Sequence, residues 1–194
     1  MREIGKDKLY YPCGLALRNV GNRQTVLVAE LDHAHRVTEW GVNVEDGNDV
    51  LCTFGTCERG GNGNSELFHP CDVAVLSSNK IAIADTGNHR ICIIDGESGS
   101  FVRVFGSKGT VKDGNFSFPC AIAADAYGHL LVLDRCTHRL QVFDTNGTHL
   151  CTRTNFFIRD GYKGLEWWGE GDRGRLAIGN STQNSTLIFD WGYM

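Results

Sequence analysis

The sequence predicts an all-β fold of short antiparallel strands, and the stretch from Phe68 to Gly106 shows the pattern best. This stretch contains four apolar runs of four or five residues, rich in Val, Ile and Ala, and each run stops at turn residues such as Ser-Asn, Thr-Gly-Asn or Gly. The runs are Asp72–Val75, Ile81–Ala84, Arg90–Ile94 and Phe101–Phe105. They predict a sheet of four antiparallel strands joined by tight turns.

The second observation is that this unit recurs along the chain. Pro12, Pro70 and Pro119 begin equivalent strands and are spaced by 58 and 49 residues. A period of about 40–50 residues with four strands per unit is typical of a β-propeller, whose blades pack face to face. We therefore expect a single domain over residues 1–194, with blades at about 11–55, 68–106, 118–152 and 163–194.

The individual strands of the other copies follow from the same runs. The first copy predicts strands at Tyr11–Leu17, Val26–Glu30, His35–Val37 and Cys52–Gly55. The third predicts Phe118–Asp125, Leu130–Asp134 and His138–Asp144, and the degenerate fourth predicts Gly164–Trp168, Arg175–Asn180 and Thr186–Asp190. The third observation is that runs such as Ile81–Ala84 are apolar at every position. A strand of this kind is covered on both faces, as in a stacked blade.

The kind of propeller is indicated by three motifs in the second copy: Pro70–Val75, Ile81–Asp95 and Phe101–Gly106. They resemble the NHL repeat, named for an Asn-His-Leu triplet that Asn88-His89-Arg90 echoes. The match is close in the second and third copies, fair in the first and weak in the fourth. The WD repeat fits worse because no copy carries Gly-His upstream of Trp-Asp, and kelch fits worse because Gly60-Gly61 occurs once, in a loop.

The resemblance implies six blades, whereas four are visible. We expect a fragment of a six-bladed propeller. A compact four-bladed ring, whose last outer strand would have to come from Ile4–Tyr10, and an arc completed by dimerisation are the alternatives. An open arc would expose two apolar blade faces, which predicts possible self-association through the open blade edges.

Composition sets further bounds. The chain is 41% hydrophobic, enough for one sizeable core. No run of 18 apolar residues and no apolar signal core occurs, so we expect a cytoplasmic protein with no membrane partner. Eight cysteines and the sequons at Asn115, Asn146, Asn180 and Asn184 keep a secreted parent protein open.

Three cysteines follow a proline at one repeat position: Cys13, Cys71 and Cys120. They start the innermost strand, so we expect them at the mouth of the central channel. Thiolates are good zinc ligands, and the resemblance implies that amidating lyases with this repeat place a zinc-binding His after the same proline. Cysteine is also a small buried hydrophobe. We favour packing, and expect no metal and no cofactor.

A second repeated set is His-Arg in the turn between the second and third strands. Each Arg follows an acidic strand end, which predicts structural braces between Asp85 and Arg90 and between Asp134 and Arg139. The turn tips on the loop-rich top face are then the predicted partner contacts. These are His35, Asn88, His89, Arg135 and His138.

The resemblance implies a non-catalytic binding platform that holds a protein partner on its top face. RNA binding is the alternative, since some family members use a strongly basic top face. Here 19 Lys and Arg stand against 23 Asp and Glu, a net charge of −4, which weighs against RNA. A metal-dependent propeller lyase or hydrolase is the second alternative. No recurring channel carboxylate supports it, because Gly14 and Ala121 replace Asp72 in the neighbouring copies, and no catalytic residue is assigned.

Overall fold

A computed structural model describes residues 3–42, 50–56, 59–76, 79–154, 162–170, 173–180 and 184–191. Within these segments the chain forms four antiparallel sheets in sequence order, here called blades 1 to 4. Blade 1 holds β1 (Pro12–Val20), β2 (Arg23–Glu30), β3 (Arg36–Gly41) and β4 (Val50–Phe54); blade 2 holds β5 (Pro70–Val75), β6 (Lys80–Asp85), β7 (Arg90–Asp95) and β8 (Phe101–Phe105). Blade 3 holds β9 (Pro119–Ala124), β10 (Leu130–Asp134), β11 (Arg139–Phe143) and β12 (His149–Arg153); blade 4 holds β13 (Tyr162–Glu170), β14 (Arg173–Asn180) and β15 (Ser185–Trp191).

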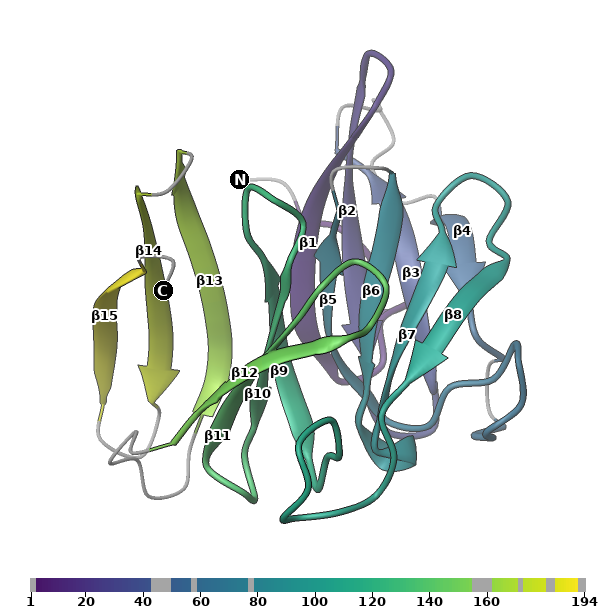
Figure 1. Ribbon diagram of the computed structural model, residues 1–194. Coiled ribbons are helices and arrows are strands. Elements are labelled where there is room, and N and C mark those ends of the chain that lie inside the picture. Colours follow the sequence, from purple (N-terminus) through teal and green to yellow (C-terminus); the bar gives the residue numbers. More distant parts are fainter. Residues whose placement is uncertain are drawn as a thin grey trace.

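The blades stand side by side as an arc, with the first strand of each on the inner side (Figure 1). Strand β1 packs against β5, β5 against β9, and β9 against β13. This arrangement confirms the all-β propeller prediction. Blade 4 has three strands in the described residues, where four were expected. A six-bladed parent stays a prediction. Within the described segments the helix is η1 (Thr86–Asn88), and no helix is long and apolar enough to cross a membrane.

The core is divided into three layers, one at each blade junction. Alternation along the innermost strand sets this division, because successive side chains of a strand point to opposite faces. In β5, Val73 packs with blade 1, while Ala74 packs with blade 3. A blade in the middle of the arc therefore buries both faces, as the all-apolar run Ile81–Ala84 predicted.

The segment before blade 1 forms a turn where the compact four-bladed ring required a strand. Amides of Lys8 and Leu9 donate to the Gly5 carbonyl, at 2.9 and 3.1 Å. A Cβ on Gly5 would lie 3.2 Å from the Trp40 ring, so this turn packs directly over β3. The compact four-bladed ring, which needs its last outer strand from Ile4–Tyr10, is therefore wrong. These residues form a turn that covers part of the free face of blade 1.

Candidate functional site on the top face

The top face is the end of the sheets where the innermost strands begin. It carries the β2–β3, β6–β7 and β10–β11 turns and the loops around residues 59–69 and 106–118, and it lies at the bottom of Figure 1. His35, His89 and His138 adopt the left-handed conformation here, with φ of 46°, 56° and 52°. Histidine is among the residues that enter this region more readily than most. The repeated His-Arg pair therefore marks one tight turn in each of blades 1 to 3.

The predicted brace in blade 2 organises a whole loop. Arg90 Nε donates to Asp85 Oδ2 at 2.6 Å, and the Asp85 carboxylate is fully buried. The same guanidinium donates to the carbonyls of Asn62 and Glu66, while Asp85 Oδ1 accepts the Phe68 amide at 2.7 Å. Blade 1 repeats the ion pair, with Arg36 Nε at 3.0 Å from Glu30 Oε1.

We expect Arg90→Ala to lower the free energy of unfolding by about 1–3 kcal/mol, because it removes a charged hydrogen-bond partner from a buried carboxylate and leaves the carbonyls of Asn62, Gly63 and Glu66 without their donor. Chemical denaturation measures the loss. The control is Arg135→Ala, whose guanidinium lies 5.6 Å from the Phe118 ring and should cost at most about 1 kcal/mol. Equal losses of unfolding free energy in Arg90→Ala and Arg135→Ala would contradict a stabilising role for the Arg90–Asp85 ion pair.

Blade 3 requires a correction. Asp134 and Arg139 face each other in the ladder, but the interactions described for them join neither to the other. The Asp134 carboxylate accepts the amides of Ser117 and Phe118, at 2.6 and 2.9 Å. Arg139 donates instead to Thr137 Oγ1 and to the carbonyls of Val111 and Asn115. Because the Asp134 carboxylate accepts hydrogen bonds from loop amides, Arg139 holds the loop through its carbonyls and makes no ion pair with Asp134.

The five predicted partner contacts divide into two groups. Three are held inward: Asn88 donates to the Gly61 carbonyl and to Asp85, His89 Nδ1 lies 2.7 Å from the Ser117 carbonyl, and His35 is buried and accepts the His69 amide. These hydrogen bonds hold loops of the top face, and the five residues as partner contacts stay a prediction. Arg135 is half-buried, as Asn88 and His89 are, and His138 is exposed.

A group of aromatic residues on this face was missed from the sequence. We define the aromatic patch as Tyr10, Tyr11, Phe68 and His69. Tyr10, Tyr11 and Phe68 are exposed, and Phe68 and His69 pack on each other with ring centroids 4.4 Å apart. The Arg36 guanidinium lies 5.8 Å from the Tyr10 ring. The signal was available, since both pairs directly precede the proline of a Pro-Cys motif.

The three Pro-Cys thiols differ in their burial. Cys13 is exposed, Cys71 is half-buried and Cys120 is buried. Cys13 Sγ donates to the Ala29 carbonyl at 3.3 Å and Cys120 Sγ to the Leu133 carbonyl at 3.6 Å, and burial raises the pKa of Cys120 to about 12. Among the described residues no group of three His, Cys, Asp or Glu could hold a metal ion. The arrangement supports packing as their role.

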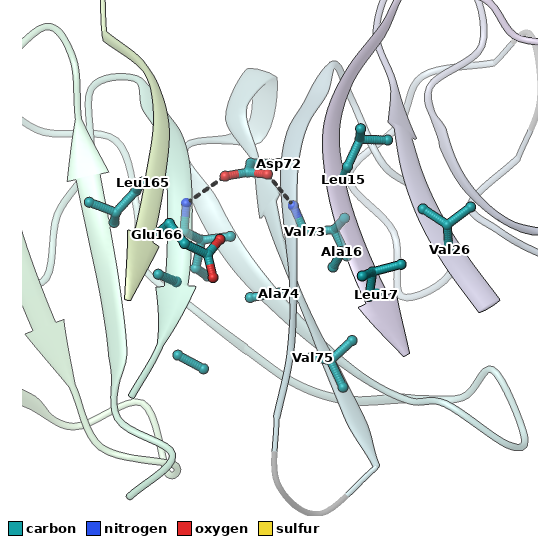
Figure 2. A pocket seen from close by; sticks show the side chains of 13 residues that line it. Leu15, Ala16, Leu17, Val26, Asp72, Val73, Ala74, Val75, Leu165 and Glu166 are labelled. Atoms are coloured by element: carbon teal, nitrogen blue, oxygen red, sulfur yellow. Dashed lines mark hydrogen bonds between the residues drawn. The ribbon is translucent and has the colours of Figure 1, made fainter. Parts of the chain in front are cut away.

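The channel side of the arc contains a cavity of about 540 Å³ lined by the innermost strands of all four blades. Figure 2 shows Asp72 at its centre, with Glu166 of β13 facing the same space. Asp72 Oδ1 accepts the Val73 amide and Oδ2 the Ile122 amide of blade 3, both at 2.9 Å. Burial raises the Asp72 pKa to about 7, and burial also raises the pKa of Glu166. Asp72 Oδ2 thus connects blade 2 to blade 3, while Oδ1 is held by the amide of the next residue in its own strand.

Comparison with known proteins agrees with this architecture. A family model for the NHL repeat matches residues 69–94 and 116–143. The protein brain tumor of Drosophila melanogaster is 36% identical over 98 residues, which cover 50% of this chain and 9% of that protein. The chain therefore spans less than a tenth of the length of this curated relative.

Solved structures are similar in fold at low sequence identity. Hydrazine synthase of Kuenenia stuttgartiensis superposes with a TM-score of 0.65 at 13% identity, over 94% of this chain and 46% of that one. The virginiamycin B lyase of Staphylococcus aureus gives a TM-score of 0.61 at 16% identity, over 93% of this chain and 55% of that one. At this identity the likeness concerns the fold alone.

Proposed function

We propose that this chain, a β-propeller built of NHL repeats, is a non-catalytic binding platform that holds a protein partner on its top face. The observation that carries the proposal is the aromatic patch. Tyr11 is 68% exposed, and Tyr10 and Phe68 are exposed too. Both pairs contact the β2–β3 turn, since the Tyr11 carbonyl accepts the Leu31 amide at 3.1 Å and the Phe68 ring lies 5.1 Å from the His35 ring. Tyrosine and phenylalanine are enriched at the centres of protein–protein interfaces, where they contribute large contact area at a small entropy cost.

The patch also has a rigid base, which favours tight binding. The backbone amide of Phe68 donates a hydrogen bond to the Asp85 carboxylate, and that of His69 donates to His35 Nδ1 at 3.2 Å. The backbone amide of Tyr10 donates a hydrogen bond to Glu30 Oε2 at 2.9 Å. Because these backbone positions are set by buried acceptors, little conformational freedom is lost when a partner docks.

Charge favours protein over RNA. Binding to a phosphate backbone needs cations that are free to face it, and the repeated arginines of the top face are occupied. Arg36 and Arg90 pair with buried carboxylates, and Arg139 is buried against loop carbonyls. Together with a net charge of −4, this supports a protein ligand.

The test compares the wild-type chain with Tyr11→Ala/Phe68→Ala. Proteins retained by both wild type and the control Val104→Ala, an exposed position on the outer strand of blade 2, are purified and titrated calorimetrically. We expect the patch variant to weaken binding by at least about tenfold. Binding of randomised single-stranded RNA that falls steeply with salt and survives in the patch variant would overturn the proposal in favour of RNA.

A further inference from the structure

The imidazole of His35 lies at the junction of blades 1 and 2, inside the arc, and accepts a hydrogen bond there. The donor is the His69 amide, at 3.2 Å from His35 Nδ1. A backbone N–H can only donate, so Nδ1 must present its lone pair, and this hydrogen bond exists only while the ring is neutral. His35 is 8% exposed, which leaves little solvent to satisfy either partner once the hydrogen bond is lost.

The histidine at the same turn position of blade 2 makes a hydrogen bond of the opposite direction. His89 Nδ1 lies 2.7 Å from the Ser117 carbonyl, which can only accept. This hydrogen bond forms with a neutral or a charged ring, because Nδ1 carries a proton in both cases. Of these two histidines, His35 alone therefore loses its contact when it gains a proton.

The hydrogen bond at His35 holds a strained segment of the aromatic patch. His69 has a φ of 50°, in the left-handed region, although it precedes Pro70. A residue before proline favours extended backbone, so this conformation persists only where neighbouring contacts hold it. The centroid of the His35 ring lies 4.6 Å from that of His69 and 5.1 Å from that of Phe68. The part of the patch that blade 2 supplies thus depends on a neutral His35.

The groups around the ring favour its neutral form on balance. Burial lowers the pKa of His35 from its usual 6.5, and a charge on the neighbouring His69 lowers it further. Weaker effects come from Asp32 and His33 on its own turn, which raise and lower the pKa respectively, and from Asp85 of β6, which raises it. The ring therefore gains its proton only in acid.

The other elements packed at this turn offer the ring little charge. Arg36, next in the chain, is paired with Glu30. The loop before blade 2 turns Gly60 toward the imidazole, since a Cβ on Gly60 would lie 3.0 Å from His35 Cδ2. The Glu66 carboxylate of this loop accepts a hydrogen bond from a loop amide instead. A protonated ring would therefore face uncharged groups and an amide N–H.

We propose that the aromatic patch is a pH-sensitive binding surface, in which protonation of His35 breaks its hydrogen bond to the His69 amide and releases Phe68 and His69. The new proton on Nδ1 points at the amide N–H, so the segment before Pro70 moves away and returns to extended backbone. This inference rests on the proposed function of the patch and names how binding there is regulated. Release weakens binding, because a partner then has to restore the preset geometry.

The first measurement needs no partner. The His35 ring signals and the amide and ring signals of Phe68 are followed by NMR in the 194-residue chain, from about pH 7.5 to about pH 4.5. The Phe68 signals should shift with the midpoint of the His35 ring, below 6.5. Phe68 signals that stay constant while His35 titrates would overturn the proposal. A His35 midpoint at or above 6.5 would also overturn it, because a hydrogen bond to the neutral ring lowers the pKa.

His35→Asn is the matched variant. Asparagine tolerates the left-handed turn at a φ of 46°, and its side-chain oxygen accepts an amide at every pH, so the Phe68 signals should lose this transition. His33→Asn is the control, because His33 lies on the same turn with a φ of 42° and a side chain that is 86% exposed. It should keep the wild-type profile. A transition of the same size and midpoint in His35→Asn would assign the effect to another group and overturn the proposal.

Binding is then measured by calorimetry with the purified protein that loses affinity for Tyr11→Ala/Phe68→Ala in the test above. One pH unit below the His35 midpoint, its affinity for the wild-type chain should be about tenfold lower than at about pH 7.5, because only the neutral fraction binds. His35→Asn should lack this loss. Equal pH dependence in both chains would overturn the inference and leave the binding platform intact. If no protein binds through the patch, the proposed function fails, while the NMR titration still decides whether Phe68 and His69 are released.

Discussion

Arg18→Leu is expected to lower the free energy of unfolding by about 3–5 kcal/mol, because it leaves a buried carboxylate without its cation. Arg18 and Glu39 are both buried, and Arg18 Nη1 lies 2.9 and 2.8 Å from the two Glu39 oxygens. The guanidinium also crosses the junction to blade 2, where it donates to Asn79 Oδ1 and the Gly96 carbonyl. Loss of the arginine therefore weakens both blade 1 and its contact with blade 2.

Urea denaturation at neutral pH measures the effect, and the repeat supplies the matched variants. In blade 2 the equivalent positions are Leu76 and Ile93, both buried. The double variant Arg18→Leu/Glu39→Ile copies that apolar pair and should recover most of the loss, as replacing both members of a buried ion pair often does. Arg23→Ala, at an exposed position on β2, should change stability by less than about 0.5 kcal/mol. A loss below about 1 kcal/mol for Arg18→Leu would contradict the account.

The fold was predictable because its signal is repeated. The period of the Pro-Cys motif and the all-apolar inner runs predict the strands, their order within each blade and the packing of blade on blade, and the structure shows the same strands in the same order. The Arg18–Glu39 pair was not predicted, because it occurs in blade 1 alone and a comparison of the repeats gives no signal for a feature that is not repeated. The turn over Trp40 was missed because Ile4–Tyr10 has no strand pattern and its position depends on a free blade face.

The site was predictable at the level of turns and not of side-chain directions. His-Arg marks the same left-handed turn in three blades, but loop amides that reach Asp134 change what Arg139 contacts. Those amides come from residues 117 and 118, across a loop whose course local sequence does not determine. Asn88 was taken as an exposed contact because it lies on a turn tip, and the carbonyl of Gly61 draws it inward.

Asp72 should make the protein less stable as pH rises from about 4 to 8. Burial raises its pKa from 3.8 to about 7 in the folded chain, although the amides of Ile122 and Val73 oppose the shift. Between these values the folded chain holds a proton that the unfolded chain has released, so its contribution to stability is full below about pH 4. That contribution is lost as pH rises through about 7, by roughly 2–4 kcal/mol at about 1.4 kcal/mol per unit of pKa.

Asp72→Ala removes this titration and is a fair substitution, because Ala121 occupies the same position in blade 3. Its unfolding free energy should lack the wild-type decline between pH 4 and 8, so the variant is less stable than wild type at acid pH and equals or exceeds it at pH 8. Denaturation midpoints across this range measure the two profiles. Asp7→Asn, an exposed carboxylate on the N-terminal turn, should keep the wild-type slope. Parallel profiles for wild type and Asp72→Ala would mean that Asp72 stays ionised in the folded chain. In that case the hydrogen bonds that Asp72 accepts from the amides of Val73 and Ile122, and not burial, would determine its protonation at the junction of blades 2 and 3.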